Sequence, residues 1–259
     1  MIKGALHIHS DVSPDSNLPL VNLKKIFKSA GYSFILLTEH AEDLDPNLYE
    51  KLKLECSTLS EPGFLIIPGL EIKWQNSVHL LAYGARFYHE NENDYSLKHT
   101  IKSIRETTQC GLLVWGHVNH PARIDQALLR QAALVDGIEV FNIGYHGFLM
   151  PDAGGLKIVD FLKKDNHNIL AVGGLDLHNE KNYAKMLCLT DKLDMLDKDS
   201  ILTCFKKGEF AFRGKFFTLK QIQRPYNPLL KFSALCVNTA EDIYRRINYK
   251  IKSGFNGIN

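Results

Sequence analysis

The sequence has few cysteines, and none of them falls in a pairing motif. The five cysteines of this 259-residue chain form no CxxC pair and no metal-knuckle spacing. Sparse, unpaired thiols exclude a disulfide-stabilised secreted domain and are typical of a reducing compartment. No apolar run reaches the roughly 18 residues of a membrane span, and the first residues, MIKGALH, lack the apolar centre of a signal peptide. We therefore expect a cytoplasmic protein that does not associate with a membrane.

Net charge is also small, at +2, and by itself it names no partner. The charge is unevenly distributed: from Arg213 onward there are nine Lys or Arg and two acids, which gives +7 there and −5 in the preceding residues. A basic segment can contact phosphate, nucleic acid or another anionic surface, although most single surface cations are only solvated. Nucleic acid is thus a possible but unfavoured partner, and the oligomeric state stays undefined.

Short apolar runs alternate with amphipathic segments along most of the chain. Strands are predicted at 3–9, 33–38, 64–67, 78–83, 112–116, 137–142 and 169–173, and helices at 19–30, 96–109, 125–134, 154–165 and 199–207. This alternation predicts an α/β fold with a parallel sheet, and the number of units favours a closed β/α barrel. We expect a barrel domain over 1–220 and a basic extension over 221–259, with a helix from about Thr239 packed on the barrel.

Side chains that bind metals recur at or near the ends of these strands. They are His7, His9, His40, Glu71, His79, His117, His120, Asp176 and His178. In a β/α barrel the carboxyl ends of the strands meet at one mouth, where active sites are built. Residues two apart on a strand face the same side, so the HIH and DLH segments can each point two ligands at one ion. Nitrogen and carboxylate ligands without thiolate suit Zn, Mn or Fe, and a carboxylate such as Glu71 can bridge two ions.

Seven short motifs follow one another in a specific order between residues 4 and 215: HIHS…PDS, LTEH, PGLEI, HLLAYG, GHVNHP, IEVFN and GGLDLH. As an ordered set they resemble the PHP family, named for polymerase and histidinol phosphatase. The resemblance implies a distorted (β/α)7 barrel, with a trinuclear metal site at the C-terminal mouth of its strands, in a stand-alone phosphoesterase. The chain departs from the family in reading TEH where TDH is common, and in having two histidines where a single His-Pro is usual.

The resemblance also implies three groups of metal ligands. The first metal would have His7, His9, Asp176 and the bridging Glu71; the second Glu71, His79 and one histidine of GHVNHP; and the third Asp15, His40 and His178.

Two histidines compete for one of these positions. His117 lies six residues after Gly111, where the strand should end, whereas His120 directly precedes the proline. A strand end holds a ligand more rigidly than a loop, so we expect His117 to bind metal. His120 would then supply a proton to the leaving group. Glu39 of the second motif either orients a ligand or faces solvent.

The chemistry expected of such a site is hydrolysis by a hydroxide shared by two or three divalent ions, which lower the pKa of water towards about 7. A small phosphomonoester or nucleotide is the expected substrate. Arg123 and Arg213 are candidates to grip its phosphate, and Lys73 is a weaker one. Two alternatives stay open: hydrolysis of a C–N or C–O bond in a non-phosphorylated substrate, and a non-catalytic interaction module stabilised by metal.

Overall fold

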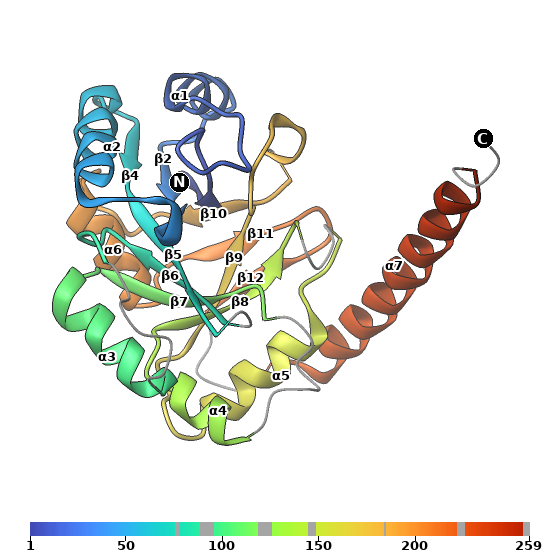
Figure 1. Cartoon of the computed structure of the whole chain (residues 1–259). Helices are drawn as coiled ribbons and strands as arrows, with labels where there is room; N and C mark the ends of the chain where they lie inside the picture. Colours follow the sequence, from blue (N-terminus) through green and yellow to red (C-terminus); the bar gives the residue numbers. More distant parts are fainter. Residues whose placement is uncertain are drawn as a thin grey trace.

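The computed structural model describes residues 1–75, 78–88, 96–118, 126–144, 149–183, 185–221 and 226–255, without the side chains of Asp242 and of 245–255. Within these ranges, helices surround two mixed β-sheets (Figure 1). The helices are α1 (Leu20–Ser29), α2 (Pro46–Leu59), α3 (Leu97–Thr108), α4 (Gln126–Ala132), α5 (Ala153–Leu162), α6 (Lys198–Lys206) and α7 (Pro228–Phe255). The α/β class expected from the sequence is therefore confirmed.

Each sheet is described by its strands in spatial order. The first contains β12 (Thr218–Lys220), β11 (Ala211–Arg213), β10 (Leu187–Thr190), β1 (Ile2–Ile8), β2 (Phe34–Leu37) and β4 (Leu65–Ile67). The second contains β3 (Glu39–His40), β5 (Gly69–Trp74), β6 (Val78–Tyr83), β7 (Leu112–Gly116), β8 (Gly137–Asn142) and β9 (Leu170–Gly174).

The two sheets are connected on both sides of β1. Only Thr38 separates β2 from β3, and only Pro68 separates β4 from β5, so each pair of strands runs from one sheet into the other. On the opposite side, the segment after β9 pairs with β1. There the Leu175 N–H donates to the Leu6 carbonyl at 2.9 Å, and Ile8 and Leu177 form a parallel bridge. β1 therefore hydrogen-bonds to two strands of its own sheet and to the segment that directly follows β9 of the other sheet.

The strand pairing is mixed, whereas the alternation of strands and helices predicted a parallel sheet. β1 is parallel to β2, and β8 is parallel to β7 and β9, but β6 is antiparallel to both β5 and β7. β10 is also antiparallel to β1 and β11, and β11 to β12. For β6 the cause is local, because β5 and β6 form a hairpin in which Trp74 pairs with Val78. A connection this short cannot accommodate the crossover that a parallel pair requires.

Helix α2 and strands β3, β5 and β10 to β12 are additions to the elements expected from the sequence. The sequence at the start of α2 contains residues that favour a helix N-terminus. The Asp45 side chain accepts hydrogen bonds from the N–H groups of Asn47 and Leu48, and Pro46 occupies the first helical position. Both are standard features of a helix N-terminus.

The C-terminal helix is longer than expected. α7 has 28 residues and begins at Pro228, so the expected start near Thr239 is wrong. Its first half packs on α5: Lys231 Nζ lies 2.6 Å from Asp160 Oδ2, and Asn238 Oδ1 accepts from the Ala153 N–H at 3.0 Å. The second half extends away from the body (Figure 1). Among the described residues, none of the helices is both long and apolar enough to cross a bilayer.

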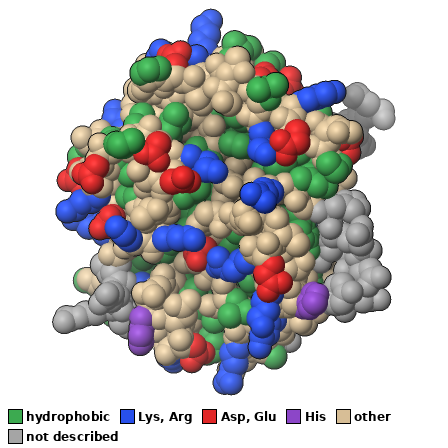
Figure 2. All heavy atoms as spheres, turned by 90° about the vertical axis from the view of Figure 1, so that its left-hand side faces the viewer, with side chains coloured by type: hydrophobic (Ala, Val, Ile, Leu, Met, Phe, Trp, Pro, Cys, Tyr) green, Lys and Arg blue, Asp and Glu red, His purple; other side chains and the backbone are tan. Residues whose placement is uncertain are grey.

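The face at the left of Figure 1 is a charged, solvated surface. Figure 2 shows basic and acidic side chains interspersed on it. Ion pairs also join side chains of α1 and α2 to nearby residues: Lys24 lies 2.6 Å from Glu61, which follows α2, and Lys53 lies 2.8 Å from Glu50. A mixed surface of this kind lacks the single sign of charge that a nucleic-acid groove requires.

Candidate metal centre

The metal-binding side chains expected from the sequence meet at one place in the fold. They are His7, His9, Asp15, His40, Glu71, His79, His117, Asp176 and His178, and most of them come from the carboxyl ends of strands. His79 is different, since it lies at the start of β6. Because β6 is antiparallel to its neighbours, its beginning lies beside the ends of β5 and β7, where His79 pairs with Lys73 and Gly116.

Glu71 occupies the middle of the centre and is 1% exposed. Its Oε1 lies 2.5 Å from His79 Nδ1 and 3.0 Å from His117 Nε2. Its Oε2 lies 3.1 Å from His7 Nε2 and 3.2 Å from His9 Nε2. Each carboxylate oxygen therefore faces its own pair of imidazoles, an arrangement that fits a carboxylate shared by two ions.

The first ligand group combines His7, His9, Glu71 and Asp176, whose potential ligand atoms all lie within 4.8 Å of one another. Asp176 Oδ1 is 3.4 Å from His7 Nε2 and 3.5 Å from His9 Nε2. Simple strand alternation does not produce this convergence. The pairing register of β1 shifts between Leu6 and Ile8, and both His7 (φ 60°) and Asp176 (φ 49°) have left-handed backbone.

Left-handed backbone costs a residue with a side chain about 1–3 kcal/mol, and such strain is concentrated at functional sites. Here it turns His7 and Asp176 inward, towards Glu71. The expectation that both pairs of ligands would face the site because of the two-residue strand period is therefore wrong in its reason. The side chains do meet, but through the register shift in β1 and the left-handed backbone at His7 and Asp176.

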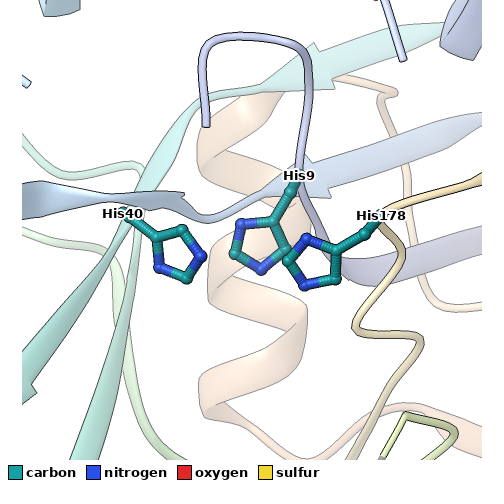
Figure 3. A group of neighbouring side chains, drawn as sticks. All are labelled: His9, His40 and His178. Atoms are coloured by element: carbon teal, nitrogen blue, oxygen red, sulfur yellow. The ribbon is translucent and has the colours of Figure 1, made fainter. Parts of the chain in front are cut away.

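The third group, Asp15, His40 and His178, lies next to His9 of the first group, whose ring stands between those of His40 and His178 (Figure 3). The centroid of the His9 ring lies 4.5 Å from that of the His40 ring and 4.2 Å from that of the His178 ring. Asp15 bridges the outer pair, with Oδ2 3.2 Å from His40 Nε2 and Oδ1 3.2 Å from His178 Nδ1. The Asp15 side chain is 58% exposed, so this end of the centre is open to solvent.

Glu39 is connected to the first group through Ser13. It is fully buried, so the alternative that it faces solvent is wrong. Its carboxylate accepts hydrogen bonds from the Ser10 N–H at 2.9 Å and the Ser13 hydroxyl at 2.6 Å. Ser13 Oγ is in turn 3.4 Å from His9 Nδ1. Burial raises the pKa of Glu39, and the Ser13 contact connects it indirectly to a potential ligand.

Glu139, in β8, is the residue that the sequence reasoning missed. It is fully buried, and its Oε1 lies 2.8 Å from His7 Nδ1. Its Oε2 accepts hydrogen bonds from the His117 backbone N–H at 2.7 Å and from Asn142 Nδ2 at 2.9 Å. The available signal was an acid inside the otherwise apolar IEVF run, because a charge is buried in a strand only when it has partners.

Gly174 makes room for Glu139. A Cβ at this position would lie 1.8 Å from Glu139 Oε1 and 2.7 Å from the Cβ of His7. Only a residue without a side chain allows β9 to lie this close to Glu139 and His7, so packing requires glycine at position 174.

The electrostatics of the centre suit a cation. Burial alone would raise the pKa values of Glu71 and Asp176, but His7 and the other imidazoles hold both well below the usual range. Burial lowers the pKa of His9, yet Asp176 and Glu71 outweigh it and raise that pKa to about 9. Buried ionised carboxylates beside imidazole nitrogens are a donor set that fits divalent transition metals, so these clusters could hold metal ions.

The remaining candidates are His120, Arg123 and Arg213. His120 and Arg123 fall outside the described residues. Arg213 is exposed on β11 and lines a pocket of about 460 Å³ together with Met1, Thr190 and Lys220. That pocket shares no residue with the metal centre. The structure therefore does not bring Arg213 to the site, because β11 is two strands away from β1.

Comparison with known proteins adds a likeness of fold. No family model matches the chain, and no curated protein matches it significantly. The crystal structure of PsfC from Pseudomonas syringae PB-5123 is similar, with a TM-score of 0.54 and 16% sequence identity. The match covers 92% of this chain and 98% of that chain. At this identity, the similarity concerns the fold alone.

Proposed function

We propose that this chain is a metal-dependent hydrolase of the PHP type that cleaves a small phosphomonoester or nucleotide. The observation that carries the proposal is the position of Glu71, whose two oxygens face two separate sets of imidazoles. Two-metal hydrolases use such a bridging carboxylate. When bound, divalent ions would lower the pKa of water and neutralise charge on phosphoryl oxygens.

The proposal includes a distorted barrel. The seven strands of this barrel would be β1, β2 continued by β3, β4 continued by β5, and β6 to β9. The hydrogen bonds between β1 and the segment after β9 would close it. The antiparallel β6 is the distortion. The centre would then lie at the mouth where the parallel strands end, as in other β/α barrels.

The ligands divide into three sets, for two or three ions of Zn, Mn or Fe. His7, His9 and Asp176 would hold one ion with Glu71; Glu71, His79 and His117 a second; and Asp15, His40 and His178 a third. Glu139 would keep the His7 imidazole oriented, because its carboxylate contacts His7 Nδ1. Glu39 would orient His9 indirectly, because it accepts a hydrogen bond from Ser13, whose hydroxyl contacts His9 Nδ1. The unpaired cysteines suit a cytoplasmic location for this enzyme.

A substrate screen tests the proposal. Protein purified without chelator, then loaded with Mn or Zn, is offered two panels of substrates, with Glu71→Gln as the matched control. One panel contains phosphate esters, including nucleotides and sugar phosphates, and the other contains non-phosphorylated esters and amides. We expect hydrolysis by the parent protein and loss of it in the variant. If the parent protein instead cleaves only non-phosphorylated esters or amides, the reaction class is wrong. If it cleaves neither panel, a non-catalytic module becomes the better explanation.

A further inference from the structure

Lys73 lies beside the centre in the β5–β6 hairpin. It is two residues after Glu71 on β5, and residues two apart on a strand face the same side of a sheet. Its partner across the hairpin is His79, and directly opposed residues also share a face. Lys73 is therefore on the side of the sheet that carries both Glu71 and His79.

The exposure of neighbouring residues places Lys73 at the rim of the centre. Ile72 and Trp74, on the other side of β5, are 2% and 7% exposed, and Glu71 is buried as well. Lys73 itself is exposed, and the His79 side chain opposite is 20% exposed. The face of the hairpin thus opens to solvent at the level of Lys73.

The charge of Lys73 is not neutralised within the described part of the chain, where no ion pair includes it. The ion pairs of the centre itself join histidines to carboxylates. Arg213, the other described candidate for binding phosphate, lines a separate pocket. An unpaired ammonium beside a site for cations is electrostatically unfavourable until an anion binds between them.

We propose that Lys73 binds a negatively charged oxygen of the substrate at the His79 edge of the centre, and that it favours phosphate esters over uncharged substrates. This inference rests on the proposed function, because it assigns a substrate class to the same site. Lysine serves as a mobile point charge for phosphate, so its long stem suits a position at the rim.

Calorimetric binding of inorganic phosphate to the Mn-loaded protein tests the role of Lys73 without turnover. The variants are Lys73→Gln, Lys73→Ala and Lys73→Arg, and Lys51→Gln, an exposed lysine of α2, is the matched control. We expect phosphate to bind about tenfold more weakly to Lys73→Gln and Lys73→Ala, by analogy with other hydrogen bonds to charged groups. Lys73→Arg should keep most of the affinity, and Lys51→Gln should match the parent. Added NaCl should reduce the difference.

Imidazole, an uncharged ligand for the ions, is the second probe. It should bind equally to the parent and to Lys73→Gln, with equal metal content. Unchanged phosphate affinity in Lys73→Gln would overturn the proposal. So would equal weakening of phosphate and imidazole, or loss of metal in both Lys73→Gln and Lys73→Ala, because either would show a structural role. The measurement is independent of the proposed reaction: a protein without phosphatase activity can show the Lys73 effect, and an active phosphatase can lack it.

Discussion

The Glu139 carboxylate lies 2.8 Å from Nδ1 of His7, and neither side chain reaches solvent. A carboxylate at this position favours the tautomer in which His7 carries its proton on Nδ1, which leaves Nε2 facing Glu71 and Asp176. The same carboxylate accepts a hydrogen bond from the backbone N–H of His117. Glu139 thereby positions one member of the first ligand group and the strand end that carries a member of the second.

We expect Glu139→Gln to weaken metal binding by about 10- to 100-fold, the usual effect of removing such a partner. The substitution conserves volume but removes the charge that holds the His7 Nδ1 proton. Metal content after dialysis against graded free Zn or Mn gives the affinity. Glu106→Gln, at an exposed position of α3, is the control. An affinity equal to that of the control would exclude the positioning role.

Glu71→Gln should be the most damaging single change to the centre. Its loss affects both ligand groups, since Oε1 and Oε2 face different imidazoles. We expect reduced occupancy of two ions and loss of most phosphatase activity in a folded protein. Elemental analysis, circular dichroism and turnover measure the three properties. Near-normal turnover would show that Glu71 does not bridge.

His117 and His120 can be separated by metal content. His117 is 4% exposed, and its Nε2 lies 3.0 Å from Glu71, so His117→Ala should lose metal. His120→Ala should keep the metal and change mainly the kinetics, because we assign it to proton transfer. Both variants are analysed for metal and for turnover of the same phosphate ester. The reverse result would exchange the two assignments.

Removing the metal should destabilise the protein. Glu71 and Glu139 are buried acids, and the nearby Asp176 side chain is 7% exposed. A ligand that binds only the folded state adds to its stability. We expect two or three ions per chain as purified, and a lower Tm after chelation that Zn or Mn restores. Less than one ion per chain, without uptake of added metal, would refute the metal centre.

Gly174→Ala should disturb the centre through packing. The new Cβ would overlap Glu139 Oε1, so the carboxylate or β9 must move. Overpacking of this kind costs about 1–3 kcal/mol, and here it also displaces the partner of His7. We expect a lower free energy of unfolding in denaturant and weaker metal binding together. A variant of normal stability with weak metal binding would still show that the new Cβ displaces Glu139. Unchanged stability together with unchanged affinity would refute the prediction.

The sequence by itself determined the α/β class, most of the strands and the nine candidate ligands. Strands such as β2 and β7 are buried along their whole length, so they read as continuous apolar runs. A His, Asp or Glu at the end of such a run is conspicuous, because burial of an ionisable group needs a partner. These signals are local, so they survive without knowledge of the fold.

Only the tertiary structure decided which distant residues support those ligands. Glu139 is 132 positions from His7, and Arg213 had the right chemistry but lies in another pocket. The antiparallel direction of β6 and the left-handed backbone at His7 and Asp176 likewise depend on contacts between strands. Residue types and spacing report what a side chain can do. Which partner it meets is set by strand register and packing, since these bring together groups far apart in the chain.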